Sequence, residues 1–452
     1  MTSQEAHLTQ RNASALAALP GEIHGDVIRP GDAEYDRART LFNGAFDRRP
    51  EAIIRPRSAE DIAAALRGAR TSGLPVAVRG GGHHVAAFGS LDGGLTIDLS
   101  LLRGVSVDPE RRVARVEGGA LWSDVDRATQ PYGLATAAAT IASVGVAGFT
   151  LGGGIGRLAR AHGLAADNLL SVELVTADGR HVSASDEENP SLFWALRGGG
   201  GNFGVVTAFE FALHDIGPEV WAGPLVYRID EAPRVLRTMR DLIESAHDEL
   251  NVSATIVRSE GHPRLVLNPL WIGEPAAADQ AVQRLRDVAA PVNDLYGPAS
   301  YLALQSVDVP GGRRSWETSA FLEQLSDVTL DALVAHAADA SLEAPRIGLL
   351  PLNGAVARVP TSATAFGGRG AGWLVSAGGT WDDESEDVAA RTWIDQLHGA
   401  VAKDATGVGY ANMMGEGRPV YPQWTHARLR SVKAAWDPAN VFRSNHNIAP
   451  FA

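Results

Sequence analysis

The sequence predicts an α+β protein in two parts, each with its own sheet and helices. In the first 215 residues, short apolar runs of strand character are separated by helical stretches and glycine-rich clusters. After Gly217-Pro218 the pattern changes to strands interleaved with amphipathic helices, which is typical of a sheet covered by helices. The boundaries that follow are a flexible tail at 1–30, a first domain at 31–217, a second domain at 218–405 and a C-terminal segment at 406–452.

The first domain opens with a predicted strand–helix–strand unit. EAIIRP (51–56) has strand character, and Ser58 followed by Asp61 resembles a capping box at a helix start. An apolar stripe continues this helix to near Gly73, and Pro75 restarts the chain as the strand VAVR (76–79). The unit therefore ends in a glycine loop at its second strand.

The remaining elements follow from alternation and turn residues. In the first domain we expect strands at 95–100, 112–119 and 205–213, a hairpin at 171–185 with Asp178-Gly179 as its two-residue turn, and a helix at 189–199. In the second domain we expect strands in VWAGPLVYRID, NVSATIVRS and RLVLNPLWIG, with helices around 231–247, 275–289 and 326–341. A last helix is expected near 422–435.

Composition excludes several classes of function. Forty basic and 53 acidic residues give a net charge of −13 with no basic run, which argues against a nucleic-acid partner. The chain has no cysteine, so disulfides, thiolate zinc sites and a cysteine nucleophile are excluded. No apolar segment is long enough to span a membrane, and the N-terminus lacks the pattern of a secretory signal. We therefore expect a cytoplasmic protein.

VAVRGGGHH (76–84) places three glycines and two histidines directly after a strand. Glycine removes side chains from the approach and permits positive φ, so successive N–H groups can form a concave anion site. A phosphate-bearing cofactor could lie there against His83. A metal site is the alternative for the two histidines, but no convergent second pair of ligands follows, and we expect no metal.

Two further glycine clusters need separate interpretations. GGGGNFG (198–204) has the spacing of a dinucleotide fingerprint, but a helix precedes it and a strand follows, the reverse of a Rossmann site. We interpret it as a helix-to-strand turn. SVGVAGFTLGGGIG (143–156) is either a tight buried crossing or a cover for the other side of an extended cofactor.

Together these motifs resemble the FAD-linked oxidases of the p-cresol methylhydroxylase/vanillyl-alcohol oxidase fold, in the berberine bridge enzyme-like branch. The resemblance is carried by the order of AIIRPRSAEDIAAALRGAR, VAVRGGGHH, GGLTIDLS, TLGGGIG, GLAADNLLSVELVTADG, LFWALRGGGGNFGVVT, GAVARVP and DPANVFRSNHNIAP. It implies a two-part FAD-binding domain, to which the C-terminal segment returns. It also implies an α/β substrate domain whose antiparallel sheet is covered by helices.

The resemblance implies a single covalent link to FAD. In this family the histidine after the Gly-Gly pair is joined to the 8-methyl carbon of the flavin, and that position is His83. His84 is the less expected attachment point. Many relatives add a second link through a cysteine, whose position falls near Ile141, and this chain has none. The residues expected to bind FAD are Arg79, Gly80, Gly81, Gly82, His83, His84, Ser143, Val144, Gly145, Gly148, Gly152, Gly153, Gly154, Gly156, Asn168, Val206, Tyr410, Asn412 and Asn445.

Two residues are candidate catalytic bases. AHG (161–163) stands where relatives show Lys-Tyr-Gly, so His162 places an imidazole where they have a phenol. The alternative for His162 is a surface loop residue. Tyr410, in GYANMM, matches the family's Tyr-x-Asn strand beside the flavin and is a second candidate base or substrate anchor. The alternative is a phenol packed on the flavin ring.

Three other positions bear on the chemistry that the resemblance implies. Gly348 stands in the approximate place of a glutamate that some relatives carry, so a carboxylate base from that strand is not expected. Glu317 is a weaker candidate for a carboxylate base, because relatives place a lysine one residue later, where Thr318 stands. Val146 sits where the family tunes oxygen access, and its modest side chain fits an oxidase.

The leading hypothesis is an FAD-dependent oxidase. It would take a hydride from a C–H next to an alcohol or amine of a small molecule, with a secondary metabolite as the expected class. Flavin N5 would accept the hydride, and dioxygen would reoxidise the flavin to give hydrogen peroxide. The alternatives are a carbohydrate or amine oxidase of catabolism, a flavin-binding protein without net redox turnover, and a nicotinamide dehydrogenase. The sequence leaves the substrate and the oligomeric state open.

Overall fold

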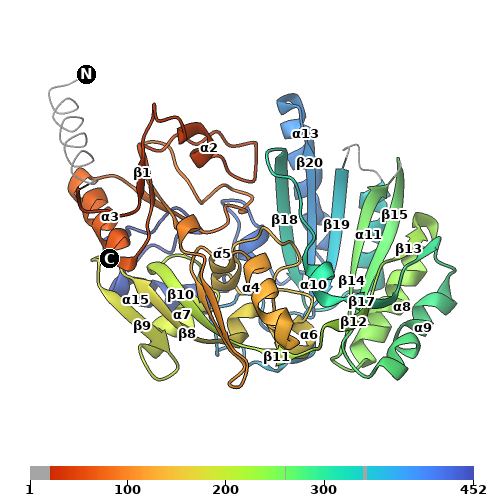
Figure 1. Cartoon of the computed structure of the whole chain (residues 1–452). Coiled ribbons are helices and arrows are strands. Elements are labelled where there is room, and N and C mark those ends of the chain that lie inside the picture. Colours follow the sequence, from red (N-terminus) through yellow and green to blue (C-terminus); the bar gives the residue numbers. More distant parts are fainter. Residues whose placement is uncertain (1–20, 260, 339–343, 452) are drawn as a thin grey trace.

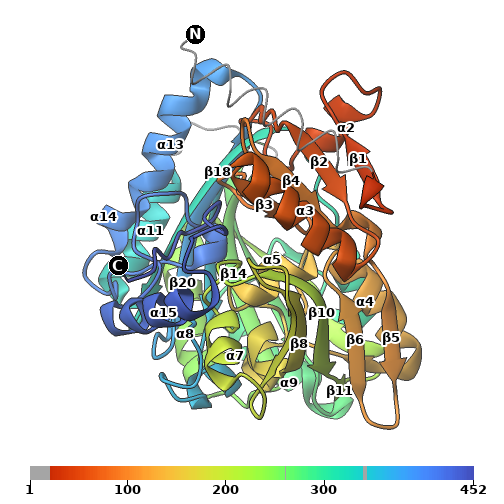
Figure 2. The same cartoon turned by 90° about the vertical axis from the view of Figure 1, so that its left-hand side faces the viewer.

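Two sheet-and-helix regions face each other in the computed structural model, which describes residues 21–259, 261–338 and 344–451. In Figures 1 and 2 one region contains the N-terminal part of the chain together with the C-terminal segment, and the other contains a large sheet with its helices. Most of the expected tail (1–20) lies outside the described residues.

The first region begins with a four-stranded sheet of order β1-β2-β4-β3. Its strands are β1 (Asp26–Ile28), β2 (Ala52–Arg55), β3 (Val76–Arg79) and β4 (Leu95–Asp98). β4 is parallel to β2 and β3, and β1 is antiparallel to β2, so three residues assigned to the tail belong to this sheet. Helix α3 (Ala59–Ser72) begins at Ser58, whose side chain accepts the Asp61 N–H, and ends at Gly73 with φ 70°. The capping residue and the helix stop are both as predicted.

A five-stranded antiparallel sheet completes the first region. Its order is β5-β6-β10-β8-β9, from β5 (Val105–Asp108), β6 (Val113–Glu117), β8 (Leu169–Val175), β9 (His181–Ser185) and β10 (Val205–Ala212). A small pair, β7 (Leu134–Ala135) and β11 (His214–Asp215), lies beside it. The helices here are α2 (Tyr35–Arg39), α4 (Trp122–Thr129), α5 (Val146–Leu151), α6 (Ala159–His162) and α7 (Pro190–Leu196). Large apolar side chains of α4, α7 and β10 share one core.

The C-terminal segment returns to this first region. Helix α15 (Gln423–Trp436) joins the same core through Leu429, and Phe442 forms a parallel bridge with Val76 of β3. The fully buried Lys433 ammonium donates to the Asp437 carboxylate (2.6 Å), the Phe442 carbonyl (2.8 Å) and the Asn202 carbonyl (2.7 Å). All three of its donors are used, which is how a buried lysine can remain charged.

The second region is a nine-stranded sheet in which every pairing is antiparallel. Its main order is β16-β13-β15-β14-β19-β20-β18, and β12 and β17 pair at one side. The strands are β12 (Glu219–Ala222), β13 (Leu225–Arg228), β14 (Leu250–Ser259), β15 (His262–Trp271), β16 (Asn293–Asp294), β17 (Gly297–Ser300), β18 (Arg314–Leu322), β19 (Ala344–Pro351) and β20 (Trp373–Trp381).

Among the described residues, five helices cover one face of the nine-stranded sheet. They are α8 (Ala232–Ser245), α9 (Ala278–Val288), α11 (Asp327–Ala338), α13 (Asp387–Asp395) and α14 (Leu397–Val401), and their apolar sides form one core with the sheet. Two short helices, α10 (Tyr301–Gln305) and α12 (Ala355–Arg358), lie outside that layer. The other face of the sheet is turned toward the first region (Figure 1). The predicted α+β class with a helix-covered antiparallel sheet is confirmed.

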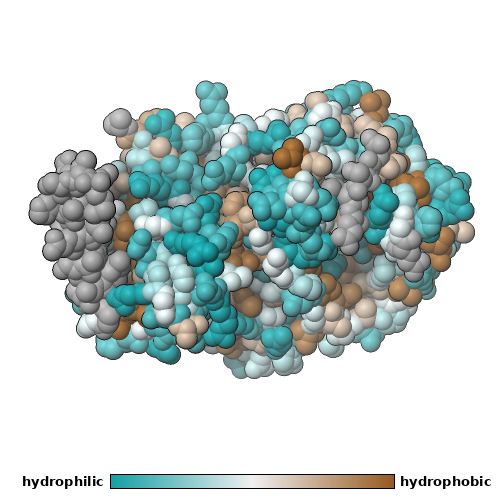
Figure 3. Space-filling view, turned by 90° about the horizontal axis from the view of Figure 1, so that it is seen from above, coloured by the Kyte–Doolittle hydropathy of each residue, from teal (hydrophilic) through white to brown (hydrophobic). Residues whose placement is uncertain are grey.

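The surface is largely hydrophilic where it is seen from above. Figure 3 shows hydrophobic residues on this face only in small separate areas. Across residues 21–259, 261–338 and 344–451, we find no helix with both the length and the hydropathy that crossing a bilayer requires.

Candidate functional site

Two glycine segments far apart in the sequence meet backbone to backbone. A Cβ atom added to Gly81 would overlap the backbone of Gly145, and one added to Gly145 would overlap the backbone of Gly81. Gly82 has a φ of 71°, a conformation that favours glycine. The structure thus brings together the loop after β3 and the loop before α5, which contains Ser143 and Val144. The wall that they form is made of main chain.

Arg79 anchors this loop from behind. Its guanidinium makes a buried ion pair with Asp98 (2.7 Å) and donates to the carbonyl groups of Ala38 and Thr40. These partners hold the side chain against the end of α2 and the chain that follows it. Arg79 therefore contributes its backbone to the glycine loop, while its charge is neutralised inside the protein.

His83 is held between groups from three parts of the chain. Its ring stacks on Phe42, with ring centroids 4.2 Å apart and planes at 22°. Burial lowers the pKa of the His83 imidazole, while the Asp308 carboxylate and the Ser143 backbone oppose that shift. Asp308 in turn accepts a hydrogen bond from the Ser143 hydroxyl (2.7 Å). The imidazole is therefore oriented and mostly unprotonated at neutral pH.

His84 differs from its neighbour because both of its ring nitrogens are engaged. Nδ1 accepts the Ala86 N–H (3.1 Å), and Nε2 donates to the Ala411 carbonyl (3.1 Å). The ring also stacks on Phe88 at 4.3 Å. Burial lowers the pKa of His84 to about 4. This side chain joins the first region to the C-terminal segment.

Tyr410 and Asn412 bind the second glycine cluster. The buried Tyr410 hydroxyl accepts N–H groups of Gly154 (3.1 Å) and Ile155 (3.3 Å) and the Asn412 amide (2.8 Å). Asn412 also donates to the Phe149 carbonyl, and a Cβ on Gly152 would overlap its side chain. Burial raises the pKa of Tyr410 to about 12, so the phenol is neutral at physiological pH.

The other glycines of this cluster pack closely as well. A Cβ on Gly153 would overlap the Phe366 ring, on Gly154 the Ala165 side chain, and on Gly156 the Ala138 carbonyl. Gly148, inside α5, has open space where a Cβ would stand. Four of the five positions thus require glycine for packing, and Gly148 is the exception.

His162 lies in a different cluster. Its ring stacks on His214 at 3.9 Å with planes at 10°, and the His214 ring is hydrogen-bonded to Asn168. Asn168 donates to the carbonyl groups of His162 (3.0 Å) and Leu164 (2.7 Å). Burial lowers the pKa of His162 to about 4, and its Nε2 is buried with no hydrogen-bond partner among the described residues. The contacts of Asn168 are thus made within the protein.

Two more of the expected residues, Val206 and Asn445, differ in their surroundings. Val206 is buried in β10, and its carbonyl would overlap a Cβ on Gly118. Asn445 lines a cavity of about 510 Å³ with Arg418, Arg443 and His446. Within the described chain its side-chain oxygen is buried without a hydrogen-bond partner. Such an atom needs a partner to offset its desolvation.

The face of the nine-stranded sheet that lies opposite its helices forms the other wall. Cross-strand partners on β18, β20 and β19 form three successive rows: Phe321–Leu374–Leu350, Ser319–Ser376–Gly348 and Glu317–Gly378–Arg346. The first row packs with Phe366 and Tyr410. In the second row, Ser319 accepts the Tyr410 backbone N–H (2.9 Å). In the third row, Glu317 and Arg346 form an ion pair (2.8 Å).

A loop of the second region closes over the first. The carbonyl of Val307 accepts the Ala142 N–H (2.8 Å), and the Gly312 N–H donates to the Phe42 carbonyl (2.9 Å). Asp308 of the same loop accepts a hydrogen bond from the Ser143 hydroxyl, so the loop lies over the stacked rings of Phe42 and His83. Sequence reasoning missed Phe42, Asp308 and Arg346, because no local pattern marks a residue whose partner lies far away in the chain.

Family models and relatives agree with this geometry. A model described as an FAD binding domain matches residues 50–185, and one described as berberine and berberine like matches residues 425–449. An FAD-linked oxidoreductase of Bacillus subtilis is 30% identical over 95% of this chain and 98% of its own length. The chain belongs to the berberine bridge enzyme-like family of FAD-linked oxidoreductases.

Two further members of the family illustrate its reach. The (R)-6-hydroxynicotine oxidase of Paenarthrobacter nicotinovorans is 29% identical over 97% of this chain and 99% of its own length. The crystal structure of 6-hydroxy-D-nicotine oxidase from Arthrobacter nicotinovorans superposes with a TM-score of 0.87. It is 28% identical and covers 95% of this chain and 98% of that one. The predicted family and fold are therefore confirmed.

The residues of this berberine bridge enzyme-like chain fit FAD. The main-chain wall around Gly81 and Gly145 leaves N–H groups without side chains over them, which suits a diphosphate. The unpartnered Asn445 oxygen suits a hydrogen-bond donor of a large cofactor. No group of three or more potential metal ligands converges within the described ranges. The protein is thus an FAD-linked oxidoreductase whose own side chains must supply binding, orientation and proton transfer.

Proposed function

We propose that this FAD-linked oxidoreductase is an oxidase that carries FAD through one covalent link at His83. The contrast between the two histidines supports the proposal. His84 uses both ring nitrogens inside the protein, whereas His83, within the described chain, is stacked on Phe42, interacts with one backbone group, that of Ser143, and lies in the field of the Asp308 carboxylate. When bound, FAD supplies the acceptor for a hydride from a C–H next to an alcohol or amine, and dioxygen then reoxidises the flavin and is reduced to hydrogen peroxide.

The chain's own groups divide the remaining work. The N–H groups of Gly80–Gly82, Ser143 and Gly145 bind the diphosphate, whereas the Val144 N–H donates to the Ile141 carbonyl (3.2 Å). Asn445 orients the cofactor from the C-terminal segment. Tyr410 holds the backbone of Gly154 and Ile155 in place. We assign proton acceptance from the substrate O–H or N–H to His162, because its Nε2 is buried, unpartnered in the described structure and unprotonated at neutral pH.

A mass measurement of the denatured chain tests the attachment. The parent protein should carry one added FAD, His83→Ala should lose the added mass, and His84→Ala should keep it. The reverse pattern would transfer the link to His84. If the native protein retains no FAD at all, the oxidase proposal fails with it.

Turnover needs a separate test. A panel of alcohols and amines, including oligosaccharides and nicotine-like amines, should yield hydrogen peroxide with at least one class. His162→Phe should slow flavin reduction by that substrate more than flavin reoxidation. Equal reduction rates in mutant and parent would return His162 to a structural role. Reduction of the flavin without peroxide would leave an oxidoreductase that uses another acceptor.

A further inference from the structure

The face of the nine-stranded sheet opposite its helices changes character along its strands. The row Phe321–Leu374–Leu350 is apolar and packs on Tyr410. The row Ser319–Ser376–Gly348 that follows carries only small residues, and it continues through Thr255 on β14. The row Glu317–Gly378–Arg346 then brings charge. The wall is therefore an apolar floor, a small polar shelf and a charged rim.

The charged rim extends across the neighbouring strands. Arg346 pairs with Val257 on β14, which pairs with Arg264 on β15. Directly paired residues of antiparallel strands point to the same face, so Arg346 and Arg264 share this surface with Glu317. Arg228 on β13 pairs with Arg264 and continues the row, but Asp230 neutralises it. Arg346 and Arg264 against the single carboxylate of Glu317 leave the rim positive, although the whole chain carries a net charge of −13.

The ion pair at the rim leaves room for a ligand. The Arg346 side chain is 49% exposed, and Glu317 occupies one end of its guanidinium through Nη2. A guanidinium has five donors, so several remain for an outside acceptor. Gly378 stands between the two residues, and a Cβ there would lie 3.2 Å from Arg346 Nη2 and 3.4 Å from Glu317 Cγ. The glycine thus makes space for the pair.

The spacing of the rows gives the size of the ligand. Strand residues rise about 3.3 Å each, so the charged rim lies about 13 Å from the apolar floor, with the shelf about 7 Å from each. Phe321, Leu374, Ser319 and Ser376 are buried. The accessible part of this face therefore runs along β19 and β14, where Leu350 and Thr255 are half-buried and Arg346 is exposed. A molecule that extends along these two strands would meet Leu350 with one end and Arg346 with the other. Guanidinium groups bind carboxylates and phosphates through paired hydrogen bonds.

We propose that Arg346, supported by Arg264, determines substrate specificity by holding an anionic group at the end of an elongated substrate remote from the oxidised carbon. Glu317 competes for the same guanidinium and so tunes its affinity for that anion. This inference rests on the proposed oxidase function, because it places the substrate between the two walls. The substrate class is an aryl- or alkyl-chain acid whose other end lies beside Tyr410.

Phenylalkanoic acids, from phenylacetate to 7-phenylheptanoate, are suitable probes, and the matching amides provide neutral controls. Calorimetric titration of the flavin-loaded protein should give tighter binding of the longer acids than of their amides, by about tenfold or more. Arg346→Gln should abolish this preference. Glu317→Gln should increase it, because the competing carboxylate is gone. If the ion pair had only a structural role, the two variants would not change the preference for acids in opposite directions.

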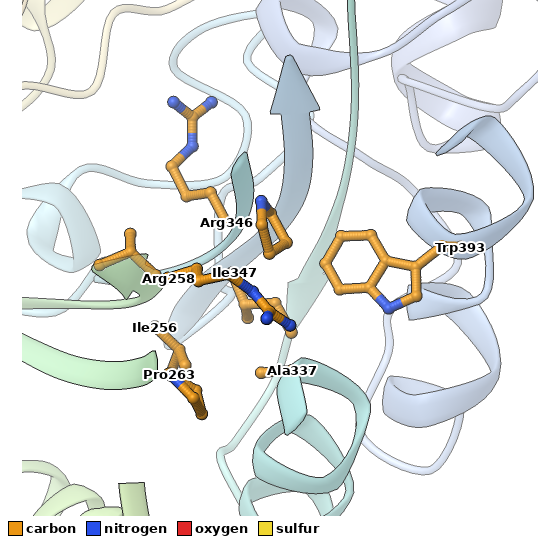
Figure 4. Close-up of a pocket in the computed structure, with 9 residues that line it drawn as sticks. Ile256, Arg258, Pro263, Ala337, Arg346, Ile347 and Trp393 are labelled. Carbon is orange, nitrogen blue, oxygen red and sulfur yellow. The ribbon is translucent and has the colours of Figure 1, made fainter. Parts of the chain in front are cut away.

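Arg258→Gln is the matched control variant. Arg258 lies one residue after Val257 on β14 and therefore on the helix-covered face, where it lines a small pocket with Ala337 and Trp393. Arg346 also lines this pocket, but Figure 4 shows its guanidinium pointing away from Ala337 and Trp393. The control removes the same charge without changing the rim, so its preference for acids should equal that of the parent.

Three outcomes would overturn the proposal: equal binding of acids and amides, no binding of any acid, or a preference that survives Arg346→Gln. These measurements need no turnover, so they are independent of the oxidase test. A protein that prefers acids but yields no peroxide would keep the rim and lose the oxidase. A protein that oxidises neutral substrates and does not bind acids would support the oxidase proposal and overturn the role of the rim.

Discussion

The two walls of the site are built on different principles. The first wall is main chain: Gly81 and Gly145 touch each other, and a side chain at either position would overlap the other segment. The second wall is the face of a regular sheet, whose ladder of backbone hydrogen bonds is independent of the side chains that project from it. A single methyl group is therefore excluded from one wall, whereas whole side chains can be exchanged on the other.

This difference separates the constant part of the chemistry from the variable part. A wall of backbone N–H groups binds an anionic group such as the diphosphate of the cofactor, which is the same whatever the substrate. A wall of side chains can be altered residue by residue without changing the fold, so it is suited to discriminate among substrates. The loop with Val307 and Asp308 holds the two walls together.

The largest expected effect comes from breaking the first wall. Gly81→Ala should abolish FAD retention, because its Cβ overlaps the Gly145 backbone and separates the two loops. Flavin absorbance per protein after gel filtration measures this loss. Gly148→Ala is the control: a Cβ has open space there, inside α5, and alanine is the better helix former by up to about 1 kcal/mol. Full flavin content in Gly81→Ala would refute the main-chain wall.

The next largest effect concerns the buried ion pair of Lys433 and Asp437, which anchors the C-terminal segment on the first region. Lys433→Met leaves the buried Asp437 carboxylate without its counter-charge and should cost about 3–5 kcal/mol of unfolding free energy. Urea unfolding followed by tryptophan fluorescence measures the change. Lys403→Met, at an exposed lysine, should stay within about 0.5 kcal/mol. If Lys433→Met loses no more unfolding free energy than the surface variant, the ion pair does not anchor the C-terminal segment.

A smaller effect depends on pH and on His84, which joins the first wall to the C-terminal segment. Its pKa is about 4 in the folded protein and about 6.5 when unfolded, so the unfolded chain binds more protons between these values. Stability is therefore lost as the pH falls, by about 2 kcal/mol at pH 5 relative to pH 8. His84→Asn should remove this part of the pH dependence, and the exposed His181→Asn should not. Parallel stability curves for parent and His84→Asn would contradict the buried, unprotonated state.

The smallest effect on the fold should come from the same glycine-to-alanine change on the second wall. In Gly348→Ala the new Cβ would lie 3.0 Å from the Ser376 hydroxyl, which can move by rotation. We expect a stability change within about 1 kcal/mol and full flavin content, since alanine is also entropically easier to order than glycine. The shelf becomes narrower, so kcat/KM for the best substrate of the panel should change. Loss of flavin in this variant would remove the distinction between the walls.

Several parts of the molecule were predictable because their signals are local. Ser58 and Gly73 mark the ends of α3 by capping chemistry that depends on a few neighbouring residues. The alternation of β10 and β14 likewise predicts strands, and the glycine loop at 80–82 is visible from composition alone. One local detail was wrong: pairing of β8 with β9 ends at Val175 and His181, so the loop around Asp178-Gly179 is longer than two residues.

The second wall was much harder to predict. Strands β18 and β20 were not expected, and β19 was expected only as the strand that carries Gly348. β20 is buried on both faces, so it has no alternation to reveal it. The ion pair of Glu317 with Arg346 depends on the register of β18, β20 and β19. Sequence reasoning considered Glu317 as a base, and only its place beside Arg346 makes it part of a rim.

By itself the sequence determined the class of the fold, the family that it resembles and the position of the glycine loops, since these follow from local spacing and residue type. The tertiary structure alone decided what each candidate side chain contacts. It engaged both nitrogens of His84, placed His162 on His214 and set Asp308 beside Ser143, 165 positions earlier. Such contacts join segments far apart in the chain, and their geometry depends on how complete sheets pack rather than on any neighbouring residue.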